Sequence, residues 1–502
     1  MMIIDLEFST LLICLVPFLF IFFINLFHSK STKIPKSYPI IGSYFSILAN
    51  KHRRIQWSSD IIQTTTNLTF TLIRPFGNRQ IFTANPSNVQ YMLKTHFHIY
   101  QKGHMFKSTM ADFLGDGIFN VDGEIWKYQR QVASHEFNTK SLRKFVETVV
   151  DAELNERLIP LLAVAAAEKK VVDFQDILQR FAFDNICKIA FGYDPAYLSP
   201  SLPQEKFAVA FEEAVKLSSE RFNAIFPFIW KIKRHFDFGS EKRFRIAVDE
   251  VRQFAKQLVR EKQSELNQKS SLDSVDLLSR FLSVGHRDDD FVTDVVISFI
   301  LAGRDTTSAA LTWFFWLISQ HPVVESSILN EIKLKSHTPA YDEVKEMIYT
   351  HASLCESMRF YPPVPIDSKT ATEDNVLPDG TFVKKGTRVS YHPYAMGRAE
   401  ELWGNDWSKF KPERWLDKDE VTGNWNFVSK DMYTYPVFQA GPRICLGKEM
   451  AFLQMKRVVA GVLRRFKVVP VTEKGVEPVF ISYLTAKMKG GFHVTIEERD
   501  HE

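Results

Sequence analysis

The longest uninterrupted apolar stretch lies at the N-terminus, where residues 8–27 carry no charged side chain. As a helix this stretch is about 30 Å long, which matches the hydrocarbon core of a bilayer. A cleaved signal peptide would have a basic start, a shorter apolar run and a small-residue cleavage site. The start carries Asp5 and Glu7 instead, and no such site follows. The pattern predicts a retained membrane anchor over residues 1–29.

The residues after this stretch predict its orientation and a link to the rest of the chain. Lys30, Lys33 and Lys36 follow the apolar run, and no Lys or Arg precedes it. By the positive-inside rule, everything downstream lies in the cytosol. Pro35 and Pro39 restrict the backbone. We therefore expect a stiff proline hinge over residues 30–45 and, because no repeat or low-complexity linker follows, one catalytic body over 46–502.

Helical spacing of apolar and charged positions dominates this body. Residues 139–158 and 241–266 show it, and 294–320 is the longest candidate helix. The short run over 381–392 is typical of strands joined by a turn. Residues 294–320 hold Arg304 and Asp305, and each would cost about 2.5–3.5 kcal/mol inside a bilayer. The sequence thus predicts a mainly α fold with minor β, in which 294–320 is a buried core helix and not a second span.

Charge and cysteine content exclude several kinds of function. The 502 residues carry a formal net charge of only +4, whereas nucleic-acid binding needs a concentrated basic surface. We therefore expect no nucleic-acid partner. The four cysteines, Cys14, Cys187, Cys355 and Cys445, lie far apart. Neither a disulfide framework nor a zinc site is indicated by that spacing.

The segment FQAGPRICLG, residues 438–447, carries the most specific motif. Cys445 stands just before a helical run and beside Arg443, a setting that favours the thiolate. A thiolate bound to haem iron favours cleavage of the O–O bond. Gly441 and Gly447 allow close backbone approach, and Arg443 can pair with a haem propionate. An isolated cysteine is usually a buried apolar side chain, but five specified positions in ten residues favour the haem interpretation.

A second motif, AGRDTTS, occupies residues 302–308 inside the long predicted helix. Thr306 can bond back to the carbonyl of Ala302 and open the helix locally. Gly303 lacks a side chain, which would leave room for a small ligand. Alone, the Asp305–Thr306 pair would be interpreted as a satisfied polar pair. Beside a haem, it predicts an acid and an alcohol that relay protons during dioxygen activation.

Two further pairings involve charged residues. Glu356 and Arg359 lie three residues apart on one helix face, and Arg414 supplies a second cation. Because buried charges must be paired, this set predicts a structural cluster. Trp126 and Arg130 lie one helical turn apart. They form either a surface pair or part of a propionate site.

These motifs, in this order, resemble the cytochrome P450 superfamily over nearly the whole chain. The resemblance implies the cytochrome P450 fold, with haem b between the long central helix and the loop that bears the axial ligand Cys445. It implies that Asp305 and Thr306 serve dioxygen activation. It also implies haem contacts for Trp126, Arg130, Lys369, Phe438, Gly441, Arg443 and Gly447, and a core salt-bridge cluster of Glu356, Arg359 and Arg414.

Longer segments, such as AGRDTTSAALTWFFWL and YHPYAMGR, resemble the plant fatty-acid omega-hydroxylase subgroup. This resemblance implies terminal hydroxylation of medium- or long-chain fatty acids by an enzyme of the endoplasmic reticulum membrane. The substrate side chains it implies are Phe119, Phe299, Ala302, Val364, Ile366 and Leu484. Two alternatives stay open: an omega-hydroxylase of a jasmonoyl–amino-acid conjugate, and a haem-thiolate sensor or carrier, against which Asp305 and Thr306 argue.

The chain contains no flavin or nicotinamide module, so its electrons must come from a partner. The resemblance implies the membrane-bound NADPH–cytochrome P450 reductase, with O2 as co-substrate. An acidic partner would dock on a basic face. Either a docking face or an ordinary solvated face accounts for the basic residues Lys127, Lys448, Lys456, Arg457, Arg464 and Arg465.

Overall fold

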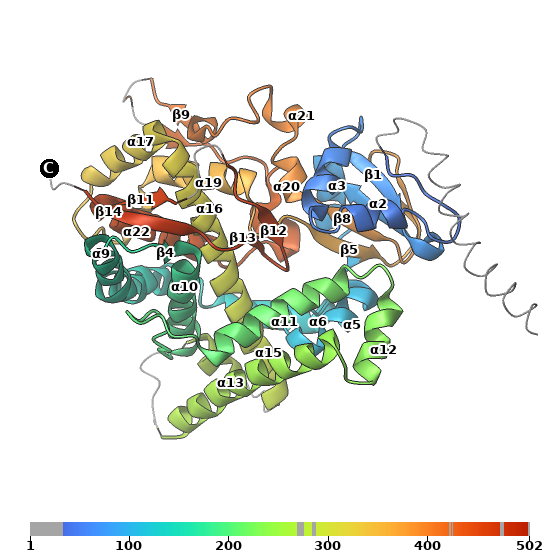
Figure 1. Ribbon diagram of the computed structural model, residues 1–502, viewed down its shortest axis with the longest axis horizontal. Helices are drawn as coiled ribbons and strands as arrows, with labels where there is room; N and C mark the ends of the chain where they lie inside the picture. The colour runs from blue at the N-terminus through green and yellow to red at the C-terminus, as the bar shows by residue number, and fades with distance from the viewer. Residues whose placement is uncertain are drawn as a thin grey trace, which may run out of the picture.

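The computed structural model describes residues 34–268, 276–283, 288–420, 423, 425–471 and 476–499 (Figure 1). The anchor predicted over residues 1–29 lies outside the described residues, as does the start of the predicted hinge. In the described ranges, no helix is both long enough and apolar enough to cross a membrane. The bounds of the predicted anchor, hinge and body stay predictions.

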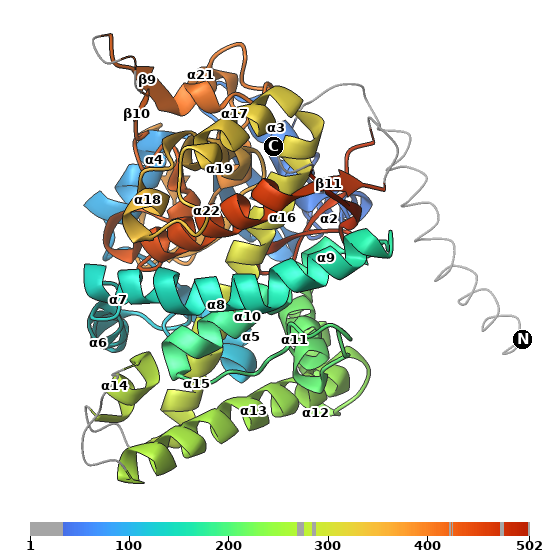
Figure 2. The ribbon, with the colours of Figure 1, turned by 90° about the vertical axis from the view of Figure 1, so that its left-hand side faces the viewer.

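The fold is mainly helical with a minor sheet component, as the periodicity predicts (Figures 1 and 2). In the described ranges the α-helices are α2 (Tyr44–Ala49), α3 (Arg54–Ile62), α4 (Pro86–Gln90), α5 (Gly103–Leu114), α6 (Gly123–Ser134), α7 (Thr139–Lys144), α8 (Asp151–Glu153), α9 (Ile159–Ala167), α10 (Phe174–Phe191), α11 (Lys206–Phe222), α12 (Pro227–His235), α13 (Ser240–Gln268), α14 (Leu277–Ser283), α15 (Asp289–Ile300), α16 (Thr306–Gln320), α17 (Pro322–Lys333), α18 (Tyr341–Lys345), α19 (Ile348–Phe360), α20 (Pro393–Met396), α21 (Glu400–Trp403) and α22 (Lys448–Arg465).

The strands form one larger sheet and several small ones. They are β1 (Thr69–Ile73), β2 (Arg79–Thr83), β3 (Tyr100–Gln101), β4 (Val172–Asp173), β5 (Asp367–Ala371), β6 (Asn375–Val376), β7 (Phe382–Val383), β8 (Arg388–Tyr391), β9 (Leu416–Lys418), β10 (Trp425–Phe427), β11 (Phe466–Pro470), β12 (Phe480–Ser482), β13 (Ala486–Met488) and β14 (His493–Glu498). The larger sheet has the order β1-β2-β8-β5-β3. Only β2 and β8 pair in parallel in it, with Gln80 opposite Arg388. The predicted strands of 381–392 are β7 and β8, but β7 pairs with β6 outside this sheet.

The long helix predicted over 294–320 is built from α15, the π-helical turn η5 (Leu301–Asp305) and α16. It is buried along most of its length, which confirms it as a core helix. Its second half packs against α10 and α19, and Figure 2 shows it passing behind α22. The predicted helix of 241–266 is α13. The run of 139–158 is helical throughout, in a continuous series from α7 to α9 with two π-helical turns.

The first described residues pack against the larger sheet. The Phe76 amide donates to the carbonyl of Ile40 at 2.6 Å, and the Ser43 amide donates to the carbonyl of Ile73 at 2.7 Å. Gly42 has φ of +56°, and a Cβ there would lie 2.6 Å from the backbone oxygen of Arg74. Glycine is therefore needed for this close approach. The contact fixes the backbone of Arg74 at the end of β1.

Candidate active site

The loop that carries Cys445 is held by backbone contacts on both sides. The Cys445 amide donates to the carbonyl of Phe438 at 2.8 Å. Gly441 has φ of +65°, and a Cβ there would meet the Leu93 carbonyl oxygen at 2.0 Å. Gly441 therefore permits packing of the loop on the Leu93 segment, whereas Gly447 lines the cavity. Burial raises the pKa of the Cys445 thiol, opposed by the Gly447 amide and by the charges of Arg130 and Lys448.

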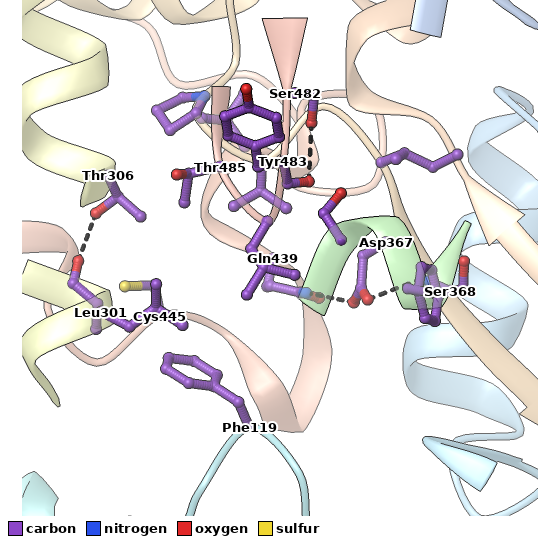
Figure 3. A pocket seen from close by; sticks show the side chains of 18 of the residues that line it. Phe119, Leu301, Thr306, Asp367, Ser368, Gln439, Cys445, Ser482, Tyr483 and Thr485 are labelled. Carbon is purple, nitrogen blue, oxygen red and sulfur yellow. Dashed lines mark hydrogen bonds between the residues drawn. The ribbon is translucent and has the colours of Figure 1, made fainter. Parts of the chain in front are cut away.

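Cys445 faces a cavity of about 810 Å³ that lies between its loop and the long central helix. Cys445 has accessible surface because it opens into this cavity, although protein surrounds it almost completely. Figure 3 shows Phe119, Thr306 and Cys445 around the same space. A cavity of this size is in the range of cofactor and ligand sites. It is the candidate active site.

Thr306 stands where the central helix opens. Its hydroxyl donates to the carbonyl of Ala302 at 2.6 Å, the back-bond expected from the sequence. The π-helical turn η5 ends directly before it, and both Ala302 and Thr306 line the cavity. Gly303 also lines the cavity, and a Cβ there would lie 2.5 Å from the Ile186 side chain. Close packing against Ile186 is therefore a second reason for glycine at this position.

Asp305 does not line the cavity. It is almost fully buried behind Thr306, where Arg304 donates to it at 2.7 Å. Arg304 also pairs with Glu212 of α11 at 2.7 Å. Burial raises the pKa of Asp305, although the charges of Arg304 and Lys487 oppose it. Its link toward the cavity is Thr485, whose hydroxyl lies 3.5 Å from the second Asp305 oxygen.

Cations line the rim of the cavity on the Cys445 side. Arg443 donates to Asp122 at 2.7 Å and to the carbonyl of Val121 at 2.8 Å. Its guanidinium lies 4.5 Å from the ring centre of Trp126, and Arg130 lies 5.8 Å from the same ring. The structure therefore brings together three of the side chains for which the resemblance implies haem contacts.

Lys369 is paired with a carboxylate at the cavity wall. It is buried against Asp367, to which it donates at 2.9 Å, and it does not line the cavity. Lys102 lines the cavity instead, with its ammonium 3.7 Å from Asp367. Gln439 also donates to Asp367, at 2.7 Å (Figure 3). Lys102 therefore adds a cation to the cavity wall, and nothing in the local sequence around Lys102 distinguishes it.

These groups fit an iron porphyrin. The thiol of Cys445 offers a soft ligand on one wall, and Lys102, Arg130 and Arg443 offer cations for two carboxylates. Burial lowers the pKa of Lys102 to about 7 despite the nearby Asp367 carboxylate, so a further anion would stabilise its charged form. The side-chain amide oxygen of Gln439 is also buried, and it has no hydrogen-bond partner in the described part of the chain.

Comparison with known proteins agrees with this site. The family model described as Cytochrome P450 matches residues 33–494. The chain belongs to the cytochrome P450 family. Cytochrome P450 94A1 and 94A2 of Vicia sativa are 64% identical over 467 residues and 63% over 474, which cover 93% and 94% of this chain and 91% and 92% of the relatives. Cytochrome P450 94B1 of Arabidopsis thaliana is 47% identical over 475 residues, covering 94% of this chain and 92% of the relative.

As a cytochrome P450, the protein is a monooxygenase that uses O2, a redox partner and a small-molecule substrate, and its cofactor is haem b. When bound, the haem supplies the iron at which dioxygen is activated. Cys445 would hold that iron, while Lys102, Arg130 and Arg443 would hold the propionates. Thr306 lies on the opposite wall, and its hydroxyl is placed where a proton can be passed into the cavity.

The six predicted substrate residues come from four parts of the chain. Phe119 follows α5, Phe299 and Ala302 belong to the central helix, Val364 and Ile366 precede β5, and Leu484 lies between β12 and β13. All six line the cavity. The cytochrome P450 therefore encloses its haem site with apolar walls from sequence-distant segments.

The predicted charge cluster forms away from the cavity. Glu356 and Arg359 are fully buried and pair at 2.8 Å, and Arg414 lies 3.3 Å from the same carboxylate. The Trp415 indole adds a donor to Glu356 at 2.9 Å. The structure brings the three predicted charges together, and each donor and acceptor in the group has a partner. This arrangement joins α19 to the segment that precedes β9.

The predicted basic docking face needs a correction at two positions. Lys456 is buried and donates to the carbonyl of Lys345 at 2.9 Å. Arg457 is buried and bonds to Asp151. Both side chains lie on the inner face of α22, because helical spacing turns them toward the core. They are not available to a partner on the surface.

Proposed function

We propose that this cytochrome P450 hydroxylates medium- or long-chain fatty acids at the terminal carbon. The electrons would come from NADPH through the membrane-bound cytochrome P450 reductase. The resemblance to plant fatty-acid omega-hydroxylases supports the proposal. The observation that carries it is the apolar wall of Phe119, Phe299, Val364 and Ile366 over the cavity that holds Cys445.

The free energy gained by burying methylene groups is large enough for a fatty acid to bind. Burial of one methylene contributes about 0.8 kcal/mol, so ten contribute about 8 kcal/mol before the costs of binding. A net value of this size corresponds to a dissociation constant of about 1 μM. Affinity then needs no polar contact along the chain. Polar contacts are left to set the orientation.

Terminal selectivity requires a geometric cause. A terminal C–H bond is harder to break than the internal C–H bonds beside it. Reactivity alone would therefore give internal alcohols. Bulky side chains near the haem can restrict access so that only the chain end reaches the reacting position. Phe119, Phe299, Val364 and Ile366 supply that bulk.

The test is product analysis with the purified protein, reductase, NADPH and a panel of substrates. The panel holds free fatty acids from dodecanoate upward and a jasmonoyl–amino-acid conjugate. We expect terminal alcohols of the free acids, identified by mass spectrometry. Internal alcohols as the main products, or no turnover of any free acid, would reject the proposal. Turnover of the conjugate alone would favour the hormone-conjugate alternative.

We further propose that the protein works at the endoplasmic reticulum membrane, with its catalytic body in the cytosol. An apolar patch supports this location, because Ile40, Phe76, Phe228 and Ile232 are exposed. The Phe226 ring joins Phe76 to Phe228 through ring contacts. Three basic residues of α12 border the patch: Lys231, Lys233 and Arg234. Such a surface suits the interface of a bilayer with anionic lipids.

Membrane binding can be measured with the anchor removed. A chain without residues 1–29 should keep its haem and still partition in part to vesicles of anionic lipid. Phe228→Ser with Ile232→Ser should reduce that partition. Ile246→Ser is the control, since Ile246 is exposed on α13 outside the patch. Equal partition of all variants would reject a membrane role for the patch.

A further inference from the structure

Three arginines gather on the cavity wall that the larger sheet supplies. Arg54 begins α3, Arg74 follows β1 and Arg388 begins β8. All three line the same cavity as Cys445. We call Arg54, Arg74 and Arg388 the arginine group. They come from segments more than 300 residues apart at the extremes, so only the fold brings them together.

The arginine group is held by neutral partners. Arg74 donates to the Gln80 side-chain oxygen at 3.1 Å and to the carbonyl of Ala224 at 2.8 Å. Arg388 donates to the same Gln80 oxygen, and Arg54 donates to the carbonyl of Asn223 at 3.3 Å. In the described ranges, no member of the arginine group forms an ion pair. Among the residues that the structure describes, these three side chains therefore have no anionic partner within contact distance.

The burial of Arg388 makes this lack of an anionic partner unusual. Arg388 is only 9% exposed. Burial, and then the like charges of Arg74 and Arg54, lower the pKa of Arg388 well below its ordinary value. Burial also lowers the pKa of Arg54 to about 10, partly offset by Glu220. Because arginine stays protonated in proteins, an anion is the remaining way to compensate this charge.

The arginine group is separate from the propionate rim. Arg54, Arg74 and Arg388 come from α3, the end of β1 and β8, whereas Lys102, Arg130 and Arg443 come from the start of α5, from α6 and from the Cys445 loop. The cavity therefore has two cationic regions. One accompanies the Cys445 loop and fits the haem. The other is the arginine group, on β8, on α3 and directly after β1.

We propose that the arginine group, with Arg388 as its most buried member, binds the carboxylate of the substrate. This inference rests on the proposed function, in which the substrate is a free acid. A guanidinium holds a carboxylate through two parallel hydrogen bonds. With the carboxylate fixed at the sheet end, the alkyl chain extends along the apolar wall toward Cys445. The arginine group then sets which end of the molecule reaches the haem.

A purely structural role accounts for part of the group only. Arg54 and Arg74 hold the carbonyls of Asn223 and Ala224 and so tie down the segment after α11. Arg388 makes no bond to that segment and lies 4.8 Å from the Phe222 ring centre. The Gln80 oxygen that it shares would keep Arg74 as donor in its absence. Arg388 is therefore the position at which ligand binding can be separated from folding.

The experiment compares dodecanoate with its methyl ester, which has the same chain and no charge. Binding is followed by the shift of the haem Soret band on substrate addition, and turnover by product formation. In Arg388→Met the dissociation constant for dodecanoate should rise by about tenfold or more, the loss expected for a charge-assisted hydrogen bond. Binding of the methyl ester should change less than about twofold, because the lost interaction needs the charge.

Two further variants separate charge from position. Arg388→Lys keeps the cation without the planar fork and should lie between the wild type and Arg388→Met. Arg79→Met removes an exposed arginine of the same sheet that does not line the cavity, and it should leave both ligands unaffected. Ligand-free Arg388→Met should melt no earlier than the wild type, because it removes a buried cation with no anionic partner.

The outcomes distinguish this inference from the proposed function. Equal losses of acid and ester binding in Arg388→Met, or a lower melting temperature in its ligand-free form, would overturn the carboxylate site. Terminal alcohols from the free acids would still uphold the proposed function in that case. A wild type that neither binds nor oxidises any free acid would overturn both. Selective loss of acid binding, with stability retained, supports the site.

Discussion

Buried charged side chains have different kinds of partner in two regions of this cytochrome P450. Behind α19, Glu356 is bonded to Arg359, Arg414 and the Trp415 indole, so each charge is neutralised inside the protein. On the sheet side of the cavity, the partners that the described residues give the arginine group are a glutamine oxygen, two backbone carbonyls and the Phe222 ring. Unpaired buried charge is costly, whereas paired charge can hold a core in one shape. The difference indicates which region serves the fold and which serves a ligand.

The largest effect is expected from replacing Cys445, which should remove the activity without removing the fold. Cys445→Ser should abolish monooxygenase activity, because an alcohol is a far poorer anionic ligand than a thiolate. The reduced, carbon-monoxide-bound spectrum should lose the Soret position typical of thiolate ligation. Cys187→Ser is the control, since Cys187 is buried outside the cavity. Retention of the thiolate-type spectrum in Cys445→Ser would contradict the ligand assignment.

The next largest effect is expected from breaking the cluster of paired charges around Glu356. Glu356→Gln leaves two buried guanidiniums facing a neutral side chain, and removing one partner of a buried pair costs about 3–5 kcal/mol. We expect faster thermal loss of the thiolate-type spectrum and poor haem retention. Asp406→Asn is the matched control, because Asp406 also bonds Arg414, at 2.8 Å, but is one-third exposed. A variant of Glu356 as stable as the control would remove the cluster from the folding core.

A smaller effect concerns coupling at the central helix. Thr306→Ala removes the hydroxyl beside the opened turn, so less of the NADPH consumed should appear as hydroxylated product and more as peroxide. A loss of several-fold in product per NADPH is expected. Thr312→Ala is the matched control: its hydroxyl makes the same back-bond, to Ser308 at 2.7 Å, but it does not line the cavity. Similar coupling in both variants would exclude Thr306 from proton delivery.

The two regions also differ in how far the sequence predicts them. The Cys445 motif and the Glu356–Arg359 pair are local patterns, because a turn or one helical face fixes the relation of their side chains. The long helix and its opened turn follow from periodicity and from the back-bonding of Thr306. The pairing of Lys369 with Asp367, two residues away on the same face of β5, is a contact that the sequence motifs did not predict. Lys456 and Arg457 were misplaced because charge alone does not reveal the inner face of a helix.

No local pattern predicts the arginine group. Arg54, Arg74 and Arg388 meet only because β2 and β8 pair in parallel and α3 packs near that sheet. The partners of Lys102 likewise depend on strand register, which places Asp367 near it. Residues that act through tertiary contact alone carry no signal in spacing or composition. This is why the sequence predicts most residues on the haem side of the cavity but only some of those on the substrate side.

The last prediction sharpens the comparison on the substrate side, where regiochemistry measures the geometry. If the arginine group fixes the carboxylate and the bulk near the haem admits only the chain end, removing bulk should move oxidation inward while the acid still binds. Phe299→Ala should therefore increase the share of internal alcohols from dodecanoate, with little change in its dissociation constant. Phe299 is buried at the cavity wall on α15.

The matched control is Phe314→Ala, on the same long helix and fully buried, but away from the cavity. Both variants lose a buried ring, which costs about 3–5 kcal/mol of stability. Only Phe299→Ala should change the products, measured by mass spectrometry. An inward shift in both would mean that general loosening sets the regiochemistry. No shift in Phe299→Ala would mean that position along the chain is set from the carboxylate end, and combining it with Arg388→Met would then show whether the arginine group alone determines it.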